Sequence, residues 1–179
     1  EKEIAGYRDV LNEIHLHYED IEFNEDTILK LHEIMMSYTG VEDAGKYKVN
    51  QNYVIEEDTQ GNRKVRFKPL EPKETPIAME QLVLAYNDAC NNININQLLL
   101  IPCVILDFLC IHPFRDGNGR MSRLLTLLLL YKSEFNVGKY ISFEEQINNS
   151  KGNYYEALRL SSINWIENEQ SYVPFIENF

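Results

Sequence analysis

The chain has 179 residues, of which 44% are hydrophobic and 25% are charged, and this balance suits one folded domain with a sizeable core and argues against disorder. Its formal net charge of −11 argues against a nucleic-acid partner, because binding to phosphate backbones requires clustered Lys and Arg. A small anionic ligand is not excluded, since a bound cation and a few arginines are enough to hold one.

Two amphipathic helices are expected at the start of the chain. Apolar residues recur at helical spacing from Ile4 to Tyr18, which predicts the first helix. Asn24 is the expected N-cap of the second helix, because its side chain can accept a hydrogen bond from a first-turn N–H group. Gly40 is the expected end of that helix, since glycine commonly follows a helix C-terminus.

The period of the pattern changes over residues 46–69. Val65 and Phe67 alternate with basic residues, which is the two-residue repeat of a half-buried strand. Residues 53–55 give the opposing strand, and the turn-forming residues 58–62 lie between the two. We therefore predict a β-hairpin in this part of the chain.

After two prolines the helical pattern resumes and continues to the end of the chain. Helices are expected at about residues 77–91, 95–111, 119–134 and 150–165, with a short one near 171–178. The apolar stretch 98–111 is too short to span a bilayer, so we interpret it as a core helix. Pro113 disfavours helical geometry at His112, and this helix should stop at about the histidine. The predicted fold class is mainly α: a helical bundle in a single domain over residues 1–179, with one hairpin across the loop that follows His112.

The cysteines and the start of the chain bear on the cellular compartment. Cys90, Cys103 and Cys110 are odd in number and lack metal-ligand spacing, so we expect buried free thiols in a reducing compartment. No signal peptide opens the sequence, and a cytoplasmic protein with no membrane partner is expected. The chain begins at Glu1 rather than at Met, which leaves room for a regulatory segment upstream.

Most of the chemistry is concentrated in residues 112–123, which read His-Pro-Phe-Arg-Asp-Gly-Asn-Gly-Arg-Met-Ser-Arg. A loop that opens straight into a helix is an anion site, because the first N–H groups of the helix have no internal partner. Arg120 and Arg123 share one helical face, and Asp116 can hold a divalent cation near phosphate oxygens. His112 can exchange a proton near neutral pH. The run therefore predicts a catalytic loop that handles phosphate groups.

These residues also have purely structural interpretations. Gly117-Asn118-Gly119 alone would be a turn, but a turn does not require the charges around it. Asp116 can cap the following helix, a role compatible with metal binding. We favour a phosphate ligand because two arginines beside a helix N-terminus would repel that end of the helix dipole unless an anion offsets them. Structural roles are expected for Phe114, as a core anchor, and for His15, His17 and His32.

The run fits the signature of Fic domains, His-Pro-Phe-x-Asp/Glu-Gly-Asn-Gly-Arg-x-x-Arg, at every specified position. Residues 45–48 resemble the family's approach to its flap hairpin, and residues 151–158 resemble the helix beside the nucleotide base. Lys48 departs from the Arg that relatives often carry, which bears on the placement of the hairpin. The resemblance spans nearly the whole chain and implies a Fic-type helical bundle, with residues 46–69 as a flap over the active-site loop at 112–123.

This resemblance implies a protein adenylyltransferase, which transfers AMP from ATP to a Tyr, Ser or Thr hydroxyl of a target protein. His112 would be the general base, Asp116 would hold Mg²⁺, and Arg120 would brace the phosphates during catalysis. Relatives that transfer phosphate carry Lys at the position of Gly119, so the glycine favours nucleotidyl transfer. The implied nucleotide contacts are Gly117, Asn118, Gly119, Arg120, Arg123, Tyr154 and Tyr155. The implied target-docking residues of the flap are Lys64, Val65, Arg66 and Phe67.

Several alternatives stay open. Tyr154 and Tyr155 are either core aromatics or contacts to the base, and the basic hairpin is either a guarded edge strand or a clamp that aligns a target segment by strand addition. UMP or phosphocholine transfer, removal of AMP, and a non-catalytic nucleotide-sensing or protein-binding module also stay open, as does a homo-oligomer.

Many Fic proteins restrain themselves with a Ser/Thr-x-x-x-Glu-Gly/Asn motif, whose glutamate pairs with the second arginine of the loop. The motif is absent here, because Ile163 and Val173 stand where Glu167 and Glu177 would need Ser or Thr. The resemblance therefore implies an inhibitory glutamate from an upstream segment or from a partner chain.

Overall fold

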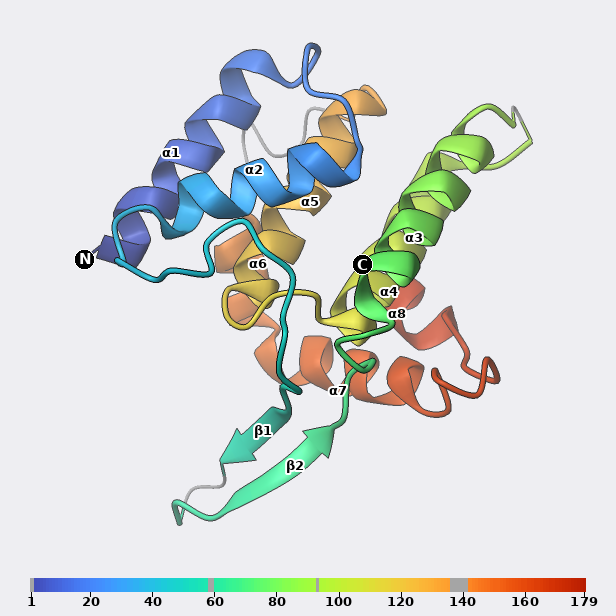
Figure 1. Ribbon diagram of the computed structural model, residues 1–179. Helices are drawn as coiled ribbons and strands as arrows, with labels where there is room; N and C mark the ends of the chain where they lie inside the picture. The colour runs from blue at the N-terminus through green and yellow to red at the C-terminus, as the bar shows by residue number, and fades with distance from the viewer. Residues whose placement is uncertain (1, 58–59, 93, 136–141) are drawn as a thin grey trace.

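The computed structural model describes residues 2–57, 60–92, 94–135 and 142–179. These residues form eight helices and one two-stranded antiparallel sheet (Figure 1). In chain order the elements are α1 (Lys2–His17), α2 (Glu25–Met36), β1 (Val54–Glu57), β2 (Arg63–Phe67), α3 (Thr75–Cys90), α4 (Gln97–Ile111), α5 (Asn118–Lys132), α6 (Phe143–Asn149), α7 (Lys151–Ser162) and α8 (Val173–Asn178). The predicted fold class, mainly α with one hairpin, is confirmed.

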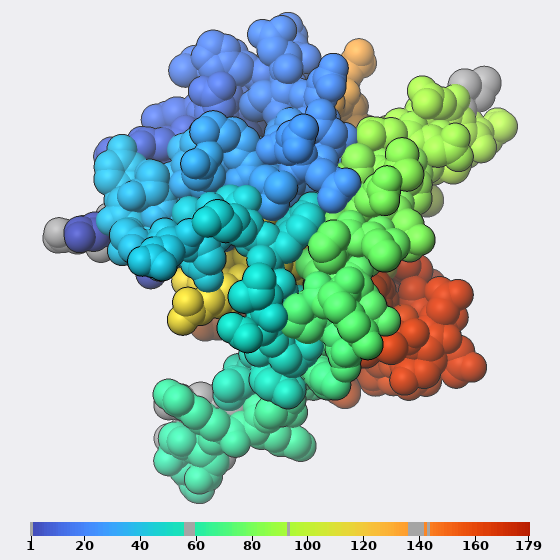
Figure 2. Space-filling model, in the orientation of Figure 1, coloured from blue at the N-terminus to red at the C-terminus, as the bar shows by residue number. Residues whose placement is uncertain are grey.

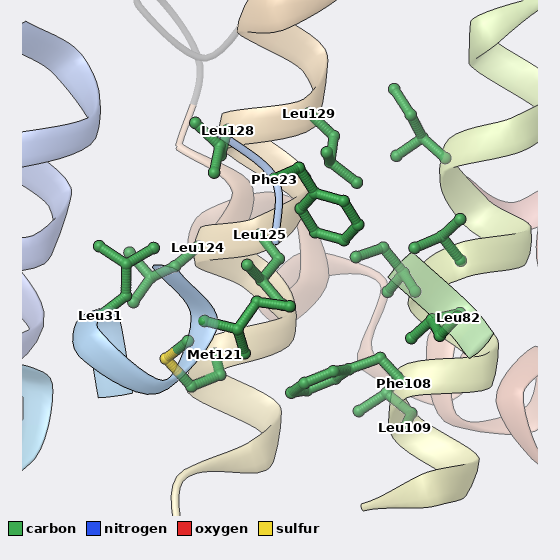
Figure 3. Close-up of a cluster of buried hydrophobic side chains, with 14 of the residues drawn as sticks. Phe23, Leu31, Leu82, Phe108, Leu109, Met121, Leu124, Leu125, Leu128 and Leu129 are labelled. Carbon is green, nitrogen blue, oxygen red and sulfur yellow. The ribbon is translucent and has the colours of Figure 1, made fainter. Parts of the chain in front are cut away.

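Helix α5 is enclosed by other helices, and its sequence explains why. The buried residues from Leu124 to Leu130 cover every side of the helix, whereas a surface helix would carry a single apolar stripe. Helices α1 and α4 pack against α5, while α2 packs against α1 and α3 against α4. Figure 3 shows Leu31 of α2, Phe108 of α4 and Met121 of α5 meeting in this core. The loop between α4 and α5 is therefore anchored at both ends in well-packed helices.

Local sequence signals account for several helix boundaries. Asn24 caps α2 as predicted, and its side chain accepts a hydrogen bond from a first-turn N–H group at 2.8 Å. Helix α2 ends at Met36, ahead of the predicted stop at Gly40. The side chains of Ser37 and Thr39 donate to carbonyls of the last turn, which satisfies those acceptors without further helix.

Helix α6 is the one element in the described residues that the sequence pattern does not predict. It has only seven residues, too few to show a clear apolar repeat. Ser142 caps it by accepting a hydrogen bond from the Glu145 N–H at 3.3 Å. The helix matters for the site because it carries Glu144 to the side of α5.

The hairpin is shorter than the predicted span. Strands β1 and β2 pair antiparallel, with an irregularity in register between Val54 and Ile55. Residues 46–53 form no strand, and they run as irregular backbone from α2 toward the hairpin. Of the turn predicted at 58–62, positions 58 and 59 lie outside the described residues.

The hairpin projects from the helical body, as Figures 1 and 2 show. The prediction of a half-buried strand is therefore wrong for its outer part: Ile55 and Val65 are 55% and 54% exposed. The base of the hairpin, at Val54, Arg66 and Phe67, is partly buried. The alternation in the sequence thus produces an apolar strip on a projecting ribbon.

The thiols and the apolar helix can also be placed. All three cysteines are free, but only Cys110 is fully buried, while Cys90 and Cys103 are partly exposed. The apolar stretch 98–111 is a core helix, as predicted. Within the described parts of the chain, every helix is too short or too polar to cross a membrane.

Candidate active site

The loop that joins α4 to α5, residues 112–117 (hereafter the connecting loop), begins where Pro113 ends a helix. Helix α4 stops at Ile111, and His112 adopts the left-handed conformation, with φ 53° and ψ 60°. Proline disfavours helical geometry at the preceding residue, so the sequence favours a boundary here. The His112 N–H still closes the last turn by donating to the Phe108 carbonyl at 2.9 Å. The predicted helix end at the histidine is confirmed.

The ring of His112 is oriented by one hydrogen bond. Its Nδ1 lies 3.1 Å from the Leu109 carbonyl oxygen. Because a carbonyl can only accept, Nδ1 carries the proton and Nε2 of the neutral ring keeps a lone pair. Burial lowers the pKa of His112, the hydrogen bond to Leu109 opposes this shift, and the Lys48 charge adds to it. The ring is therefore neutral near pH 7 and can accept a proton.

The ring of His32, in α2, contacts the connecting loop through a hydrogen bond and a stacking interaction. Its Nδ1 accepts a hydrogen bond from the Gly45 N–H at 2.9 Å, so its Nε2 carries the proton and donates to the Asp116 carbonyl at 3.0 Å. Its ring also stacks on Phe114, with centroids 3.7 Å apart and planes 1° from parallel. Phe114 is the core anchor that the sequence predicts, and His32 ties α2 to the loop.

The Gly-Asn-Gly turn is closed by the side chain of Asn118. Asn118 accepts a hydrogen bond from the Phe114 N–H at 2.9 Å and donates to the Phe114 carbonyl at 2.7 Å. Gly117 has φ 83°, and a Cβ there would meet Met35 Cε at 2.6 Å, so the turn requires glycine. The Asn118 side chain is buried in these bonds. The N–H groups of Asn118 and Gly119 belong to the first turn of α5, where N–H groups have no partner within the helix.

Both arginines of the predicted site are paired with carboxylates. Arg120 Nη2 lies 3.1 Å from Asp116 Oδ2, and Arg120 Nη1 lies 3.1 Å from Glu3 Oε2 of α1. Arg123 Nε lies 3.7 Å from Glu144 Oε1 of α6. The chain itself thus supplies the anions that offset two cations at a helix N-terminus. These charges alone do not require a bound ligand.

A cavity of about 490 Å³ lies between the connecting loop, the hairpin and α7, a size typical of small-molecule sites. Of the predicted site residues it brings together His112, Gly119, Arg123, Tyr154, Tyr155, Arg66 and Phe67. The hairpin is held over it by Arg66, which donates to the Tyr155 carbonyl at 2.9 Å. Outside the lining lie the predicted residues Lys64, Val65, Asp116, Gly117, Asn118 and Arg120.

A sequence model of the Fic/DOC family matches residues 22–130 of the chain. The chain belongs to the Fic/DOC family. The protein adenylyltransferase fic-1 of Caenorhabditis elegans is 29% identical over 114 residues, which cover 64% of this chain and 20% of that protein. The protein of the same name from Caenorhabditis briggsae is 28% identical over 114 residues, with the same coverage. This Fic domain therefore spans about a fifth of the length of these curated relatives.

Solved structures share the fold over nearly the whole chain. A Fic family protein from Desulfovibrio desulfuricans has a TM-score of 0.75 at 24% identity, covering 98% of this chain and 48% of that chain. A Fic domain containing signaling protein from Bacteroides thetaiotaomicron has a TM-score of 0.76 at 24% identity, covering 98% of this chain and 65% of that chain. The predicted Fic-type bundle is confirmed.

Asp116 is the carboxylate of the Fic loop, the signature residues 112–123, that is predicted to hold Mg²⁺. Its side chain is 67% exposed, and Oδ1 accepts a hydrogen bond from the Gly117 N–H at 2.6 Å. In the described ranges no three His, Cys, Asp or Glu side chains are grouped so as to hold a metal ion. A lone exposed carboxylate fits Mg²⁺, which uses one or two protein carboxylates and takes its other ligands from phosphates and water.

The tyrosine pair of α7 fits both of its interpretations. Tyr154 packs edge-on against Phe175 with centroids 5.8 Å apart, and it also lines the cavity. Burial raises the pKa of Tyr154 to about 12, so its hydroxyl stays protonated. Tyr155 is 39% exposed, and the Arg66 guanidinium lies 5.9 Å from its ring centroid.

Several residues to which the sequence assigned no part in the site contact the Fic loop or its arginines; they include His32, Lys48, Asn52, Glu3, Asp43 and Glu144. The first three lie 60 to 84 positions along the chain from their partners. Their partners are backbone carbonyls, which every residue carries, so no sequence pattern marks these contacts. The one available signal was the position of Lys48 in the stretch that resembles the family's approach to the flap.

Proposed function

We propose that this Fic domain is a protein adenylyltransferase that transfers AMP from ATP to a Tyr, Ser or Thr hydroxyl of a target protein. The observation that supports the proposal most is a single cavity bordered by the His112 ring, the first turn of α5 and Arg123. A proton acceptor beside an anion site is the minimum that group transfer from a nucleotide requires. Similarity to proteins named protein adenylyltransferase points the same way.

The phosphates would be held by the N–H groups of Asn118 and Gly119 at the start of α5. Arg120 and Arg123 would exchange their present carboxylate partners for phosphate oxygens. Tyr154 and Tyr155, on the far wall of the cavity, would contact the base. Asp116 would hold Mg²⁺, which offsets the negative charge of the phosphate oxygens when bound.

In the reaction His112 Nε2 would take the proton of the target hydroxyl. The hydroxyl oxygen forms a bond to the α-phosphorus as the bond from that phosphorus to the bridging oxygen breaks, and pyrophosphate leaves. A Tyr hydroxyl, with an unperturbed pKa of about 10, needs less assistance from a neutral imidazole than Ser or Thr. Most of the rate would come from positioning and electrostatics.

The target protein would dock on the hairpin. The hairpin carries the predicted docking residues Lys64, Val65, Arg66 and Phe67; Lys64 and Val65 are exposed, and Arg66 and Phe67 are partly buried. An extended target segment could add to a free strand edge through backbone hydrogen bonds. Phe67 and Arg66 at the base of the hairpin line the cavity, so a segment docked there would lead toward His112.

The test is the intact mass of the protein and of candidate targets after incubation with ATP and Mg²⁺. Added AMP is expected with the wild type and not with His112→Ala, while His17→Ala, at an exposed histidine of α1, should behave as the wild type. A panel with UTP and CDP-choline, and an AMP-modified substrate, would reveal UMP transfer, phosphocholine transfer or AMP removal instead. Nucleotide binding with no transfer from any donor would contradict the proposal and support a nucleotide-sensing module.

A further inference from the structure

Two residues of the irregular segment 46–53, Lys48 and Asn52, hold a continuous row of backbone carbonyls that runs from the end of α4 into the connecting loop. The Lys48 N–H donates to the Pro113 carbonyl at 2.8 Å, and Lys48 Nζ donates to the Ile111 carbonyl at 3.0 Å. Asn52 Nδ2 donates to the His112 carbonyl at 3.1 Å and to the Phe114 carbonyl at 2.9 Å. The carbonyls of residues 111 to 114 therefore all accept from Lys48 or Asn52.

The two donors also bind each other. Lys48 Nζ donates to Asn52 Oδ1 at 2.8 Å, which leaves the amide nitrogen of Asn52 directed at the carbonyls. The amide of Asn52 is thereby fixed in one orientation, because its oxygen needs a donor and its nitrogen needs acceptors. We call this pair, with its four carbonyls, the carbonyl clamp.

The carbonyl clamp lies on a backbone that needs support. His112 is a non-glycine residue at φ 53°, a conformation that side chains other than glycine rarely adopt. Such a conformation persists only where surrounding contacts determine it, and it is concentrated at functional sites. The clamp binds the carbonyl of His112 and those on either side, so it fixes the dihedral angles that set the direction of the ring.

Lys48 is an unusual choice for a purely structural contact. It is 5% exposed, and both acceptors of its Nζ are uncharged oxygens. Burying a charge is costly unless a specific gain offsets it, and burial lowers the pKa of Lys48 to about 8. The positive charge of Lys48 has an electrostatic effect on the site, because a cation beside His112 disfavours the imidazolium form of the ring.

We propose that Lys48 and Asn52 are positioning residues for the reaction at His112, which hold its backbone so that the ring faces the cavity with Nε2 available. The inference deepens the proposed function, and it rests on that function only for the effect on turnover. Lys48 and Asp116 are the charged groups that act on the ring, and Arg123 lines the same cavity.

The variants are Lys48→Met, which keeps the apolar stem and removes the charge, Asn52→Ala, which removes two donors, and the conservative Lys48→Arg. Lys46→Met is the matched control, because Lys46 is exposed on the same segment and its side chain donates to the Glu42 carbonyl, which is not part of the clamp. Thermal unfolding of each variant shows which proteins are folded at the assay temperature. Asn52→Ala provides a second test if Lys48→Met does not fold.

The first readout needs no activity: ¹⁵N NMR of the His112 ring, assigned by comparison with His112→Ala, reports its tautomer and its pKa. In Lys48→Met the pKa of His112 should rise, since the neighbouring cation is gone, and in both Lys48→Met and Asn52→Ala the Nδ1–H tautomer should be less populated. Lys48→Arg and Lys46→Met should match the wild type. An unchanged ring tautomer and pKa in the folded Met and Ala variants would overturn the proposal.

The second readout is turnover. Lys48→Met and Asn52→Ala should lower kcat for AMP transfer on the order of tenfold to hundredfold, with little change in the KM for ATP, because a base displaced by about 1 Å loses rate rather than ligand affinity. Wild-type kcat in the folded variants would contradict the inference. If the wild type transfers no AMP, the proposed function fails, and the NMR experiment still decides whether the clamp positions the ring.

Discussion

Replacing Glu144 with Gln is expected to tighten the binding of ATP. Glu144 Oε1 lies 3.7 Å from Arg123 Nε and also accepts a hydrogen bond from the Tyr7 hydroxyl, which ties the carboxylate to α1. A triphosphate that uses Arg123 must displace this carboxylate, and its own negative charge is repelled by it. Glutamine keeps the size of the side chain and an oxygen for Tyr7, and it removes the charge.

The size of the effect follows from the exposure of the pair. The side chains of Arg123 and Glu144 are 24% and 41% exposed, so solvent screens the interaction and its net worth is about 0.2–1 kcal/mol. At about 1.4 kcal/mol per factor of ten, losing this competitor strengthens ATP binding by up to about fivefold. The removed repulsion acts in the same direction and is weakened by salt.

Titration calorimetry with ATP and Mg²⁺, in a His112→Ala background that prevents turnover, measures the Kd directly. Glu145→Gln is the control, because it removes the same charge from an exposed neighbour on the same helix. In an Arg123→Gln background the gain from Glu144→Gln should shrink. Equal Kd values for the two glutamine variants, or a gain undiminished without Arg123, would refute competition between Glu144 and the nucleotide.

Three further outcomes are expected. Phe114→Ala should lower the free energy of unfolding in urea by about 3–5 kcal/mol, since Phe114 is 0% exposed; a loss below 1 kcal/mol, roughly, would contradict its role as an anchor. Gly119→Ala should raise the free energy of unfolding by about 0.5–1 kcal/mol, because a Cβ at this position has room, 3.7 Å from the nearest guanidinium nitrogen. The same substitution should weaken ATP binding, because Gly119 lines the cavity. A variant in which stability and ATP affinity both rise or both fall would contradict this prediction. Burial raises the pKa of the Asp107 carboxyl, so the folded protein binds the carboxyl proton more tightly than the unfolded chain does. The contribution of Asp107 to the free energy of unfolding therefore decreases as pH rises above about 3.9. Asp107→Asn keeps an oxygen that accepts the hydrogen bonds of Trp165 and Tyr172, and it should remove this loss of stability. The unfolding free energy of the wild type minus that of the variant should therefore decrease as pH rises. A difference that does not change with pH would contradict the predicted direction.

The parts of the fold that the sequence predicts well are those encoded in short-range patterns. Helices α4 and α5 were predictable because their apolar residues are dense, and the end of α4 because Pro113 acts on the residue before it. Helix α6 was not, since seven residues carry no readable repeat. The hairpin pattern predicted strands correctly, but alternation does not say whether the apolar side meets a core, and Val65 is exposed.

In the candidate site, too, the residues that lie close together in the sequence were predictable and the residues from distant segments were not. The Fic loop was predictable because its base, carboxylate, glycines and arginines lie within twelve consecutive residues. Its supports were not, because His32, Lys48 and Asn52 bind backbone carbonyls that carry no sequence identity. For His32 the sequence predicted a structural role, but it did not indicate that the ring binds the Asp116 carbonyl.

The two arginines show why charge arguments need the tertiary structure. A helix N-terminus beside two cations predicts an anion, and that physics is correct. The sequence could not show that, beside Asp116, the anions include Glu3 of α1 and Glu144 of α6. In the proposed function a nucleotide would have to replace these ion pairs, so Arg120 and Arg123 would contribute only the difference between phosphate and carboxylate as partners. Because the carboxylates of both pairs are exposed to solvent, which makes such a difference small, the backbone N–H groups at the start of α5, which have no partner within the helix, would then provide much of the selectivity for phosphate.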